Sequence, residues 1–463
     1  MINNRAFDQR IQVLNDRPVR SGRYVLYWMQ QSQRAAFNHA LEYAIDEANS
    51  IGQGVVVGFG LMDNYPEANA RHYLFMLQGL RDTEGRLKKR GIRMVVRRGN
   101  PSDIALELGQ QASIIVCDRG YLRHQKQWRR QVAASARCRV VQVESDVVVP
   151  VFRVSGKAEY AARTIRPKIH RHLQACLVEL RGRRPRVSTL EFPIAGMPID
   201  HPADVLEQLS INRAVKPVPG GFVGGTSEAI KRFDRFLAQR VGHYSAHSNQ
   251  PQTDDVSTMS PYLHFGQISP NYLALKLQRH QAVPNDEREA FLEELVVRRE
   301  LAVNFVEYTP NYDGFEALPG WAKTTLAEHK TDRRSYLYPM RALEAADTHD
   351  AYWNAAMREM KSTGFLHNYM RMYWGKKILE WSETPEQGFR TTLKLNNTYF
   401  IDGRDPNSYA GVAWVFGLHD RAWKERPIFG KIRYMAASGL ERKFDVDAYL
   451  RKVDRLEAGK EFR

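Results

Sequence analysis

Cysteine is scarce in this sequence, and the clusters of side chains that bind metals are missing. Among its 463 residues there are three cysteines, Cys117, Cys138 and Cys176, with no CxxC pair and no histidine partner at a metal-binding spacing. An odd, scattered set of cysteines argues against a disulfide framework and against a zinc site. We therefore expect reduced, partly buried thiols, no metal centre and a cytoplasmic protein.

Long apolar runs and the common phosphate-binding motifs are missing as well. No apolar run approaches the ~18 residues that cross a bilayer, and residues 1–22 lack the apolar core of a signal peptide. No GxGxxG follows the first strand candidate, and no GxxxxGK(S/T) occurs. The sequence thus predicts neither a membrane protein nor an ordinary dinucleotide-binding or P-loop enzyme.

Acidic residues are outnumbered by basic ones. The chain has 68 Lys and Arg against 52 Asp and Glu, a formal net charge of +16. Such an excess favours a polyanionic partner such as nucleic acid, although an enzyme that is merely basic stays an alternative. The chain is also too long for one ordinary compact core, so two domains are the default expectation.

The first third of the chain alternates apolar strands with helices. Strands are predicted at 23–30, 54–61, 92–99, 112–120 and 138–145, and helices at 33–50, 68–89, 101–110 and 122–136. Continuous β-branched strands separated by helices indicate a parallel sheet buried on both faces. We expect a doubly wound α/β domain over 22–152, where a ligand could lie at the carboxyl ends of the strands.

The remaining chain changes character twice. Residues 153–225 contain basic, Pro- and Gly-rich pieces and are predicted to be a connector, in which RGRRPR (181–186) is a solvated loop. From Thr226 onward helical periods dominate, which predicts a helical domain over 226–463. The expected fold class is therefore α/β plus all-α.

Two helical motifs of the second domain carry residue types suited to chemistry. In SPYLHFGQIS (260–269), Ser260 and Pro261 are typical of a helix start. This start is either that of an ordinary capped helix or a binding site for a pyrophosphate. In LHNYMRMYWGKKILEW (366–381), Trp374 and Trp381 lie two turns apart, and Trp353 is on the preceding helix. On these grounds alone, core packing is the ordinary interpretation of the tryptophans.

Two further segments are polar or basic. KLNNTYFIDGRDPNSYAGVAW (394–414) contains turn signals that predict a loop between helices, whose Asn and Asp side chains meet a cofactor or simply build the turn. Residues 421–433 interleave five cations with aromatics, as nucleic-acid surfaces do, although a solvated basic face is the alternative. The basic stretch 121–140 extends that surface or is one solvated helix face.

Together, SPYLHFGQIS, EELVVRRELAVNF (293–305), WGKKILEW, FIDGRDPN and ERPIFGKIRYM resemble the class II photolyases of the DNA photolyase/cryptochrome superfamily. The resemblance covers 244–435 in the expected order and, less distinctively, the first domain. It implies a light-driven carbon–carbon lyase that binds FAD, splits cyclobutane pyrimidine dimers in UV-damaged duplex DNA and acts as a monomer, near the nucleoid in a prokaryote. It also implies an antenna chromophore in the first domain, of the 8-hydroxy-5-deazaflavin or folate type.

The resemblance further implies roles for individual residues. The FAD-binding set is Tyr244, Ser257, Thr258, Met259, Ser260, Gln267, Arg299, Asn304, Asn396, Asp402 and Gly403. The catalytic set is Asn396 beside flavin N5, Glu294, and the electron-relaying Trp374, Trp353 and Trp381. The lesion- and DNA-binding set is Arg298, Met372, Trp414, Arg421, Trp423, Lys431 and Arg433. Glu294 and Arg298 are expected to pair at i,i+4.

Two other functions stay open at this stage. A cryptochrome-type photoreceptor would have the same fold and flavin but would signal instead of repairing. An adenine-nucleotide-binding α/β protein fused to a helical nucleic-acid-binding domain would need a phosphate loop or metal ligands, which the sequence lacks. Repair of (6-4) lesions would need a histidine acid, and neither His367 nor His419 matches that motif.

Overall fold

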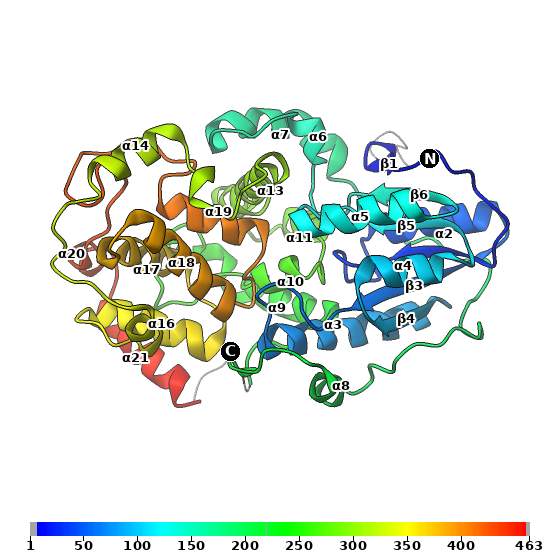
Figure 1. Ribbon diagram of the computed structural model, residues 1–463. Helices are drawn as coiled ribbons and strands as arrows, with labels where there is room; N and C mark the ends of the chain where they lie inside the picture. The colour runs from blue at the N-terminus through cyan, green and yellow to red at the C-terminus, as the bar shows by residue number, and fades with distance from the viewer. Residues whose placement is uncertain (1–6, 219, 460–463) are drawn as a thin grey trace.

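A computed structural model describes residues 7–218 and 220–459. The chain forms an α/β half and a helical half that lie side by side (Figure 1), as the sequence predicts. Within the described residues, no helix combines the length and apolar character needed to cross a membrane, and no group of three or more potential metal ligands comes together.

The α/β half is built on a six-stranded sheet in the order β1-β6-β5-β2-β3-β4. Its strands are β1 (Ile11–Val13), β2 (Tyr24–Trp28), β3 (Gly54–Leu61), β4 (Arg93–Arg98), β5 (Ala112–Asp118) and β6 (Arg139–Val143). Strands β2 to β6 pair in parallel, confirming the predicted parallel sheet, whereas β1 pairs antiparallel with β6. This short edge strand lies before residue 22, so the sheet extends beyond the expected domain boundary.

Helices cover both faces of the sheet because its strands are apolar on both sides. Along β2, Val25 and Tyr27 pack into one core, and Leu26 and Trp28 into the other. The helices α2 (His39–Ser50) and α3 (Ala70–Lys88) cover the first face, and α4 (Pro101–Gly109) and α5 (Arg123–Ser135) cover the second (Figure 1). Helix α2 begins six residues later than predicted, because Asn38 caps it by accepting from the Leu41 amide.

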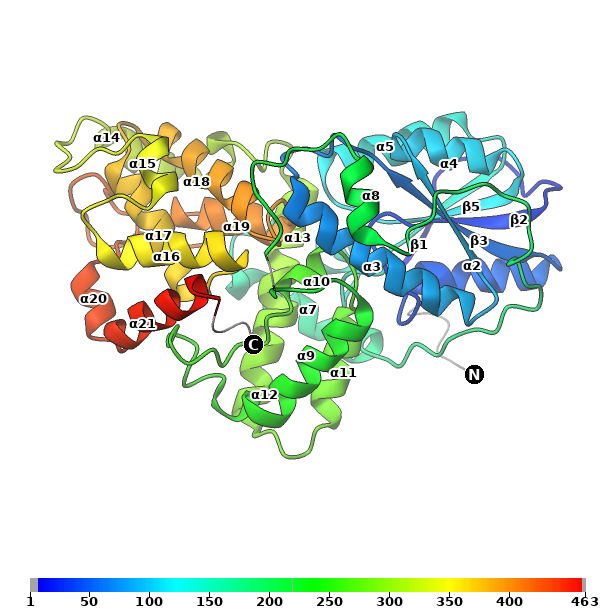
Figure 2. The same cartoon turned by 90° about the horizontal axis from the view of Figure 1, so that it is seen from below.

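The connector passes over both halves, as expected. Helix α6 (Val151–Val154) and helix α7 (Ala162–Cys176) lie against the helical half, and residues 187–197 run along β4. Helix α8 (Pro202–Gln208) packs against α3 (Figure 2). The RGRRPR segment is a loop, as predicted, and is fastened to α2 by an ion pair between Arg183 and Asp46.

The second half of the chain is helical throughout. Its α-helices are α9 (Thr226–Gln239), α10 (Ser260–His264), α11 (Pro270–Arg279), α12 (Asn285–Leu292), α13 (Arg299–Tyr308), α14 (Gly320–Glu328), α15 (Met340–Ala345), α16 (Ala351–Thr363), α17 (Asn368–Trp381), α18 (Pro385–Tyr399), α19 (Pro406–Val415), α20 (Ala437–Glu441) and α21 (Val446–Glu457). Short 3-10 turns occur at Val241–His243 (η1) and Phe315–Ala317 (η3), and a π-helix spans Glu293–Arg298 (η2).

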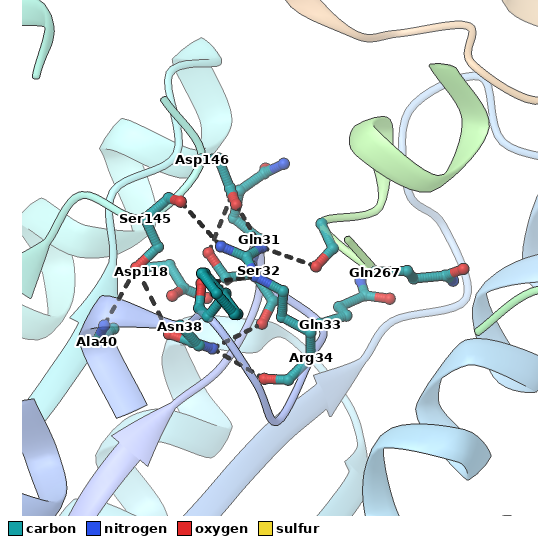
Figure 3. A network of polar contacts seen from close by, with 12 residues as sticks. Gln31, Ser32, Gln33, Arg34, Asn38, Ala40, Asp118, Ser145, Asp146 and Gln267 are labelled. Atoms are coloured by element: carbon teal, nitrogen blue, oxygen red, sulfur yellow. Dashed lines mark hydrogen bonds and ion pairs between the residues drawn. The ribbon is translucent and has the colours of Figure 1, made fainter. Parts of the chain in front are cut away.

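A buried polar network at the carboxyl ends of β2, β5 and β6 joins the halves (Figure 3). The Asp118 carboxylate accepts from three successive amides of residues 30–32, each at 3.0 Å. Arg34 pairs with Asp146 at 2.6 Å, and the same guanidinium donates to the carbonyl of Gly266 in the helical half at 2.8 Å. Burying a guanidinium is costly unless its N–H groups are hydrogen-bonded. This network therefore holds the carboxyl ends of the strands against the helical half.

Candidate functional site

A cavity of about 690 Å³ opens among the helices of the second half. Its wall comes from α10, α12, η2, α17, α18 and α19 together with the loops around 245–259 and 402–408. Eleven of the residues expected at the site line it: Tyr244, Ser257, Thr258, Met259, Ser260, Glu294, Arg299, Met372, Trp374, Asn396 and Asp402. The structure thus gathers residues from 244 to 402 around one cavity.

The hydroxyl-rich turn at 257–260 forms part of this wall. Thr258 has a φ of +53°, a conformation that β-branched residues rarely adopt and that marks a tight, over-determined turn. Helix α10 begins at Ser260, as predicted, but Met259 holds the capping position, and no side chain caps the helix. The expected capping role of the Ser260 hydroxyl is therefore wrong. Ser260 instead lines the cavity.

The segment Glu293–Arg298 differs from expectation in its helix type. It is a π-helix, in which residues five apart lie one above the other, so Arg298 pairs with Glu293 at 3.2 Å. The expected pairing of Arg298 with Glu294 is therefore wrong. Glu294 instead faces the cavity, and burial raises the pKa of its carboxyl. Single turns of π-helix occur frequently at functional sites.

The segment from 394 to 414 is only partly the loop that its turn residues predict. Helix α18 continues to Tyr399, so Asn396 lies in its last turn and donates from Nδ2 to the Ser408 hydroxyl at 2.7 Å. The loop proper is 400–405, where Asp402 pairs with Arg371 of α17 at 3.1 Å. The loop prediction extended too far toward the N-terminus. Asparagine favours turns over helices, so the two asparagines at 396–397 resembled loop residues although they lie in the last turn of α18.

Several expected cofactor ligands lie outside the cavity and hold the protein together. Gln267 is fully buried, and its Oε1 accepts from the Gly225 amide at 2.7 Å, which fastens the end of the connector. Asn304 accepts from the Glu159 amide at 2.7 Å and so also holds the connector. Gly403 packs tightly on the end of α18, where a Cβ would meet the Asn396 carbonyl at 3.0 Å. All three positions make contacts within the protein, and their role in FAD binding stays a prediction.

The three tryptophans form a continuous buried group behind the cavity. Trp374 lines the cavity, and its carbonyl accepts from the Trp353 indole N–H at 2.9 Å. The rings of Trp353 and Trp381 have centroids 5.6 Å apart. From Trp381, edge contacts lead to Tyr338 and His349 at 5.4 and 5.2 Å. The group packs in the core, and the contacting rings of Trp353 and Trp381 extend it outward from the Trp374 backbone.

His367 also lines the cavity, but it is not an acid. Burial lowers the pKa of its imidazole to about 4, and its Nδ1 accepts from the Tyr369 amide at the start of α17. The pKa of His419 is lowered to about 4 by burial as well, and its ring bonds the Tyr160 carbonyl. Both rings are neutral at neutral pH, which fits the absence of a (6-4)-type motif.

Five of the seven expected lesion- and DNA-binding residues lie on α19 and on the loop that follows it, whereas Arg298 lies on η2 and Met372 on α17. Trp414 and Arg433 are in contact, with the guanidinium carbon 5.7 Å from the ring centroid. Trp423 is exposed, and the guanidinium groups of Arg421 and Arg433 each lie 5.0 Å from its ring. This arrangement presents an aromatic ring and two cations together on the surface.

The shape of this loop depends on residues that no sequence motif singles out. The Asp332 carboxylate accepts from the Ile428 amide at 2.7 Å, and the Thr325 hydroxyl accepts from the Lys431 amide at 3.0 Å. His329 bonds both Asp332 and Glu425, and these two carboxylates raise its pKa. Helix α14 and the segment after it thus hold the part of the loop around residues 425–431. These contacts join residues about 100 positions apart in the chain, which no local sequence pattern predicts.

A second cavity, which the sequence did not map to residues, lies at the carboxyl ends of the strands. It measures about 80 Å³ and is lined by amides and aromatic rings, among them Gln30, Gln31, Gln125, Tyr65 and Trp128. Gln125 donates to Gln31 at 2.6 Å, and Gln30 accepts from the Gly60 amide at 3.0 Å. The sequence signal for this cavity was the amide-rich QQSQ (30–33) at the end of the first predicted strand. Such folds bind ligands at the carboxyl ends of their strands.

The larger cavity suits an elongated cofactor that carries phosphates and a flat ring. Its volume lies within the ~300–1,000 Å³ typical of cofactor sites. The hydroxyls at 257–260 and the Arg371 and Arg299 guanidiniums suit phosphate or carbonyl oxygens. Within the described part of the chain, the buried Trp374 indole N–H at this wall has no hydrogen-bond partner. The residues present therefore fit a dinucleotide such as FAD.

The basic stretch 121–140 is only in part the solvated helix face that was one of its two expected forms. Arg123 pairs with Asp313, Lys126 pairs with Glu307, and Arg129 is buried against Gln142. Arg130, Arg137 and Arg139 remain on the surface of α5 and just beyond it. Half of its cations thus contact the protein and half face solvent.

Comparison with known proteins agrees with this geometry. Residues 25–187 match the DNA photolyase family. The chain is 48% identical to a deoxyribodipyrimidine photo-lyase of Methanothermobacter thermautotrophicus over 97% of its own length and 98% of the relative, and 38% identical to one of Arabidopsis thaliana over 93% and 89%. A Synechocystis cryptochrome shares the fold, with a TM-score of 0.72 and 15% identity over 94% of this chain and 90% of that one. The chain belongs to the DNA photolyase family.

Proposed function

We propose that this chain is a deoxyribodipyrimidine photo-lyase, a carbon–carbon lyase that uses light to split cyclobutane pyrimidine dimers in DNA. One observation carries the proposal. An open cavity of about 690 Å³ is lined by eleven of the residues that the class II resemblance assigns, in a chain 48% identical over nearly its whole length to an enzyme of that name. The motifs WGKKILEW and ERPIFGKIRYM support the class II assignment.

In this proposal the helical cavity holds FAD. The hydroxyl-rich turn 257–260 and Tyr244 bind its phosphates, and the Arg371–Asp402 pair and Asn396 face its ring system. When bound and reduced, FAD supplies the photoexcited electron that opens the cyclobutane ring and then returns. The protein contributes no nucleophile to this chemistry. It contributes position, exclusion of water and fixed charges.

The side chains of the wall prepare the site for a one-electron reaction. Asn396 is held by Ser408 and Asn397, so its amide presents a fixed dipole to the ring of the cofactor. Because burial raises the pKa of Glu294, its carboxyl keeps a proton over a wider pH range than an exposed glutamate would.

The loop after α19 acts on the duplex. A dimer inside a duplex must leave the stack before it reaches the cavity, which leaves a gap between base pairs. The exposed ring of Trp423 and the Arg421 guanidinium are placed to enter that gap, and Trp414 packs against the extruded dimer. Lys431 and Arg433 neutralise the neighbouring phosphates.

The smaller cavity takes the antenna chromophore in this proposal. It lies at the carboxyl ends of the parallel strands and offers amide groups, aromatic rings and two cations, Arg299 and Arg404. These groups suit a flat, partly anionic ring system, of the 8-hydroxy-5-deazaflavin or folate type. The chain is further proposed to act as a monomer in the cytoplasm, at the nucleoid in a prokaryote, where its DNA substrate lies; light scattering of the purified protein tests the monomer.

The decisive experiment compares light with darkness. FAD-loaded protein is incubated with a duplex that carries one thymine dimer, under blue light and in the dark. We expect loss of the dimer in the light alone. Loss under both conditions or under neither contradicts the proposal. A cryptochrome-type photoreceptor, the alternative, would reduce its flavin in light but leave the dimer intact and would not prefer damaged over intact DNA.

A further inference from the structure

The loop that joins η1 to α10 provides part of the wall of the helical cavity on both sides of its middle part. Residues 248–249 line the cavity before this middle part, and residues 256–258 line it afterwards. Residues 250–255, which the structure describes in full, lie between these two stretches and outside the lining. A contact that holds residues 250–255 therefore sets the position of both lining stretches.

Residues 250–255 are held by a buried lysine of the last helix. Lys452 of α21 is only 4% exposed, and its ammonium donates to the Pro251 carbonyl at 2.8 Å and to the Asp254 carboxylate. The Glu359 carboxylate of α16 lies 3.2 Å from the same nitrogen. An ammonium has three N–H groups, and these three acceptors use all of them. The lysine thus joins the loop to the packed pair of helices α16 and α21 (Figure 2).

The partners of Lys452 keep it charged and in place. Burial favours the neutral amine, but the Glu359 and Asp254 carboxylates outweigh it and raise the pKa of the ammonium above its ordinary value. Glu359 is fixed in turn, because the Tyr449 hydroxyl donates to its other oxygen at 2.6 Å. A buried cation that loses an acceptor is destabilised, so this contact favours one position of residues 250–255 over the alternatives.

The backbone of the loop adopts two uncommon conformations at and after this contact. Asp254 has a φ of +59° and Thr258 a φ of +53°. Residues other than glycine seldom adopt such angles, and surrounding contacts must maintain them. Arg240 donates to the Asp254 carbonyl at 2.9 Å, and Gln250 donates to the Lys443 carbonyl at 2.8 Å. The shape of this part of the cavity wall thus depends on contacts made outside the cavity.

We propose that Lys452 is a positioning residue of the FAD site, whose ammonium holds residues 250–255 and, through them, the hydroxyl-rich turn 257–260 in the conformation that receives the phosphates. The inference rests on the proposed function and extends the site to a residue of α21 that is not among the described lining of the cavity. A loop that is held in place before binding loses less conformational entropy when its ligand arrives. Lys452 therefore raises the affinity for FAD without touching it.

The test measures FAD affinity by flavin fluorescence as apoprotein is titrated with FAD. For Lys452→Met, we expect binding to weaken about tenfold, the effect of having to order one residue that wild type already holds. The matched control is Arg358→Gln, which removes the ion pairs of Arg358 with Asp454 and Glu457 in the same contact between α16 and α21 but leaves the loop intact. Unchanged affinity in Lys452→Met, or an equal loss in the control, overturns the proposal.

A second variant changes the contact from the loop side and leaves the core intact. Asp254→Asn retains the buried pair of Lys452 with Glu359, and asparagine tolerates the same positive φ, so this variant folds even if Lys452→Met does not. We expect FAD to bind several-fold more weakly to it. The double variant Lys452→Met/Asp254→Asn should bind FAD no more weakly than Lys452→Met, because both changes remove one contact. Losses that multiply in the double variant contradict a shared contact.

Two readouts separate a positioning role from a general loss of structure and from failure of the proposed function. At saturating FAD, the absorption spectrum of the bound flavin and the repair rate per bound flavin should be the same in Lys452→Met and wild type. A shifted spectrum would mean that Lys452 acts on the ring system, which overturns its assignment to the phosphate turn. If wild type does not bind FAD, the proposed function fails; if wild type binds FAD and the variants bind it equally well, the positioning role alone fails.

Discussion

The two cavities of this molecule are built in different ways. The helical cavity, at about 690 Å³, takes its wall largely from four sequence motifs between residues 244 and 415 and includes charged pairs such as Arg371–Asp402. The cavity at the strand ends, at about 80 Å³, draws single side chains from many segments, and its polar groups are mainly amides and hydroxyls. The helical cavity is thus assembled from contiguous motifs, whereas the smaller one combines its amides and hydroxyls with the charged side chains of Asp146, Arg299, Arg404 and Asp405.

The two cavities nevertheless share part of their walls. Arg299 and Asp405 line both, and Arg299 also donates to the Asp146 carbonyl of the sheet edge at 2.6 Å. Asp405 faces His264 across 3.4 Å and caps α19 by accepting from the Asn407 amide. The two cavities therefore differ in the residues that line them but are not separated from each other. Substitution of single residues in each wall tests this comparison.

The largest effect is expected from the charged pair of the helical cavity. Asp402→Ala leaves the partly buried Arg371 guanidinium without its carboxylate, and we expect FAD to bind about 100-fold more weakly. Flavin fluorescence on titration with FAD measures this affinity. The matched control, Asp313→Ala, breaks the more exposed Arg123–Asp313 pair and should leave FAD affinity unchanged; equal loss in both variants would contradict the role of the cavity pair.

The next effect concerns a tryptophan behind the wall of the larger cavity and one in the wall of the smaller cavity. Trp353→Phe changes the ring that lies between the Trp374 backbone and Trp381, and we expect light-driven reduction of the bound flavin to slow by a factor on the order of ten or more. Trp128→Phe, in the wall of the smaller cavity, should not change that rate. Absorbance of the flavin under continuous light measures it. Repair after chemical reduction should be equal in both variants, because the rings then have no electron to supply.

The contrast between the cavities also explains how much the sequence could predict. Parallel strands, the helical half and the wall of the larger cavity follow from apolar runs and contiguous motifs, which are local signals. The Glu293–Arg298 pair was missed because a π-helix changes the spacing that matters, and Gln267 and Asn304 were misplaced because their partners lie in the connector. The smaller cavity and the loop contacts of Asp332 depend on side chains distant in sequence, which no pattern in a single sequence reports.

A smaller effect is expected where the two walls meet. Arg299→Leu removes a guanidinium that both cavities share, so binding of FAD and of the antenna chromophore should each weaken about tenfold, the value of one charged hydrogen bond. Gln125→Ala should weaken binding of the antenna chromophore alone. Titration of the apoprotein with FAD and with a deazaflavin separates the two. If Arg299→Leu changes only one affinity, the cavities are less coupled than their common wall indicates.

The last expected effect is a pH dependence of stability at the contact between the halves, away from both cavities. Glu300 of α13 is buried and accepts from the Val148 and Val149 amides beyond the sheet edge, and burial raises the pKa of its carboxyl from an ordinary 4.5 to about 8. The folded protein therefore holds a proton that the unfolded chain releases. Its contribution to stability is fully present below pH 4.5 and is lost as the pH rises toward 8, by at most about 1.4 kcal/mol per pH unit.

Replacing this carboxyl isolates its share of the pH dependence. Glu300→Gln keeps an oxygen that accepts from the same amides but has no proton to lose, so its free energy of unfolding should fall less between pH 5 and pH 8 than that of wild type. Urea unfolding at a series of pH values measures both proteins. Glu289→Gln, at an exposed carboxyl of α12, is the control and should follow the wild-type curve closely. Parallel curves for Glu300→Gln and wild type would mean that Glu300 stays ionised in the fold, with the Arg10 and Arg299 guanidiniums outweighing its burial.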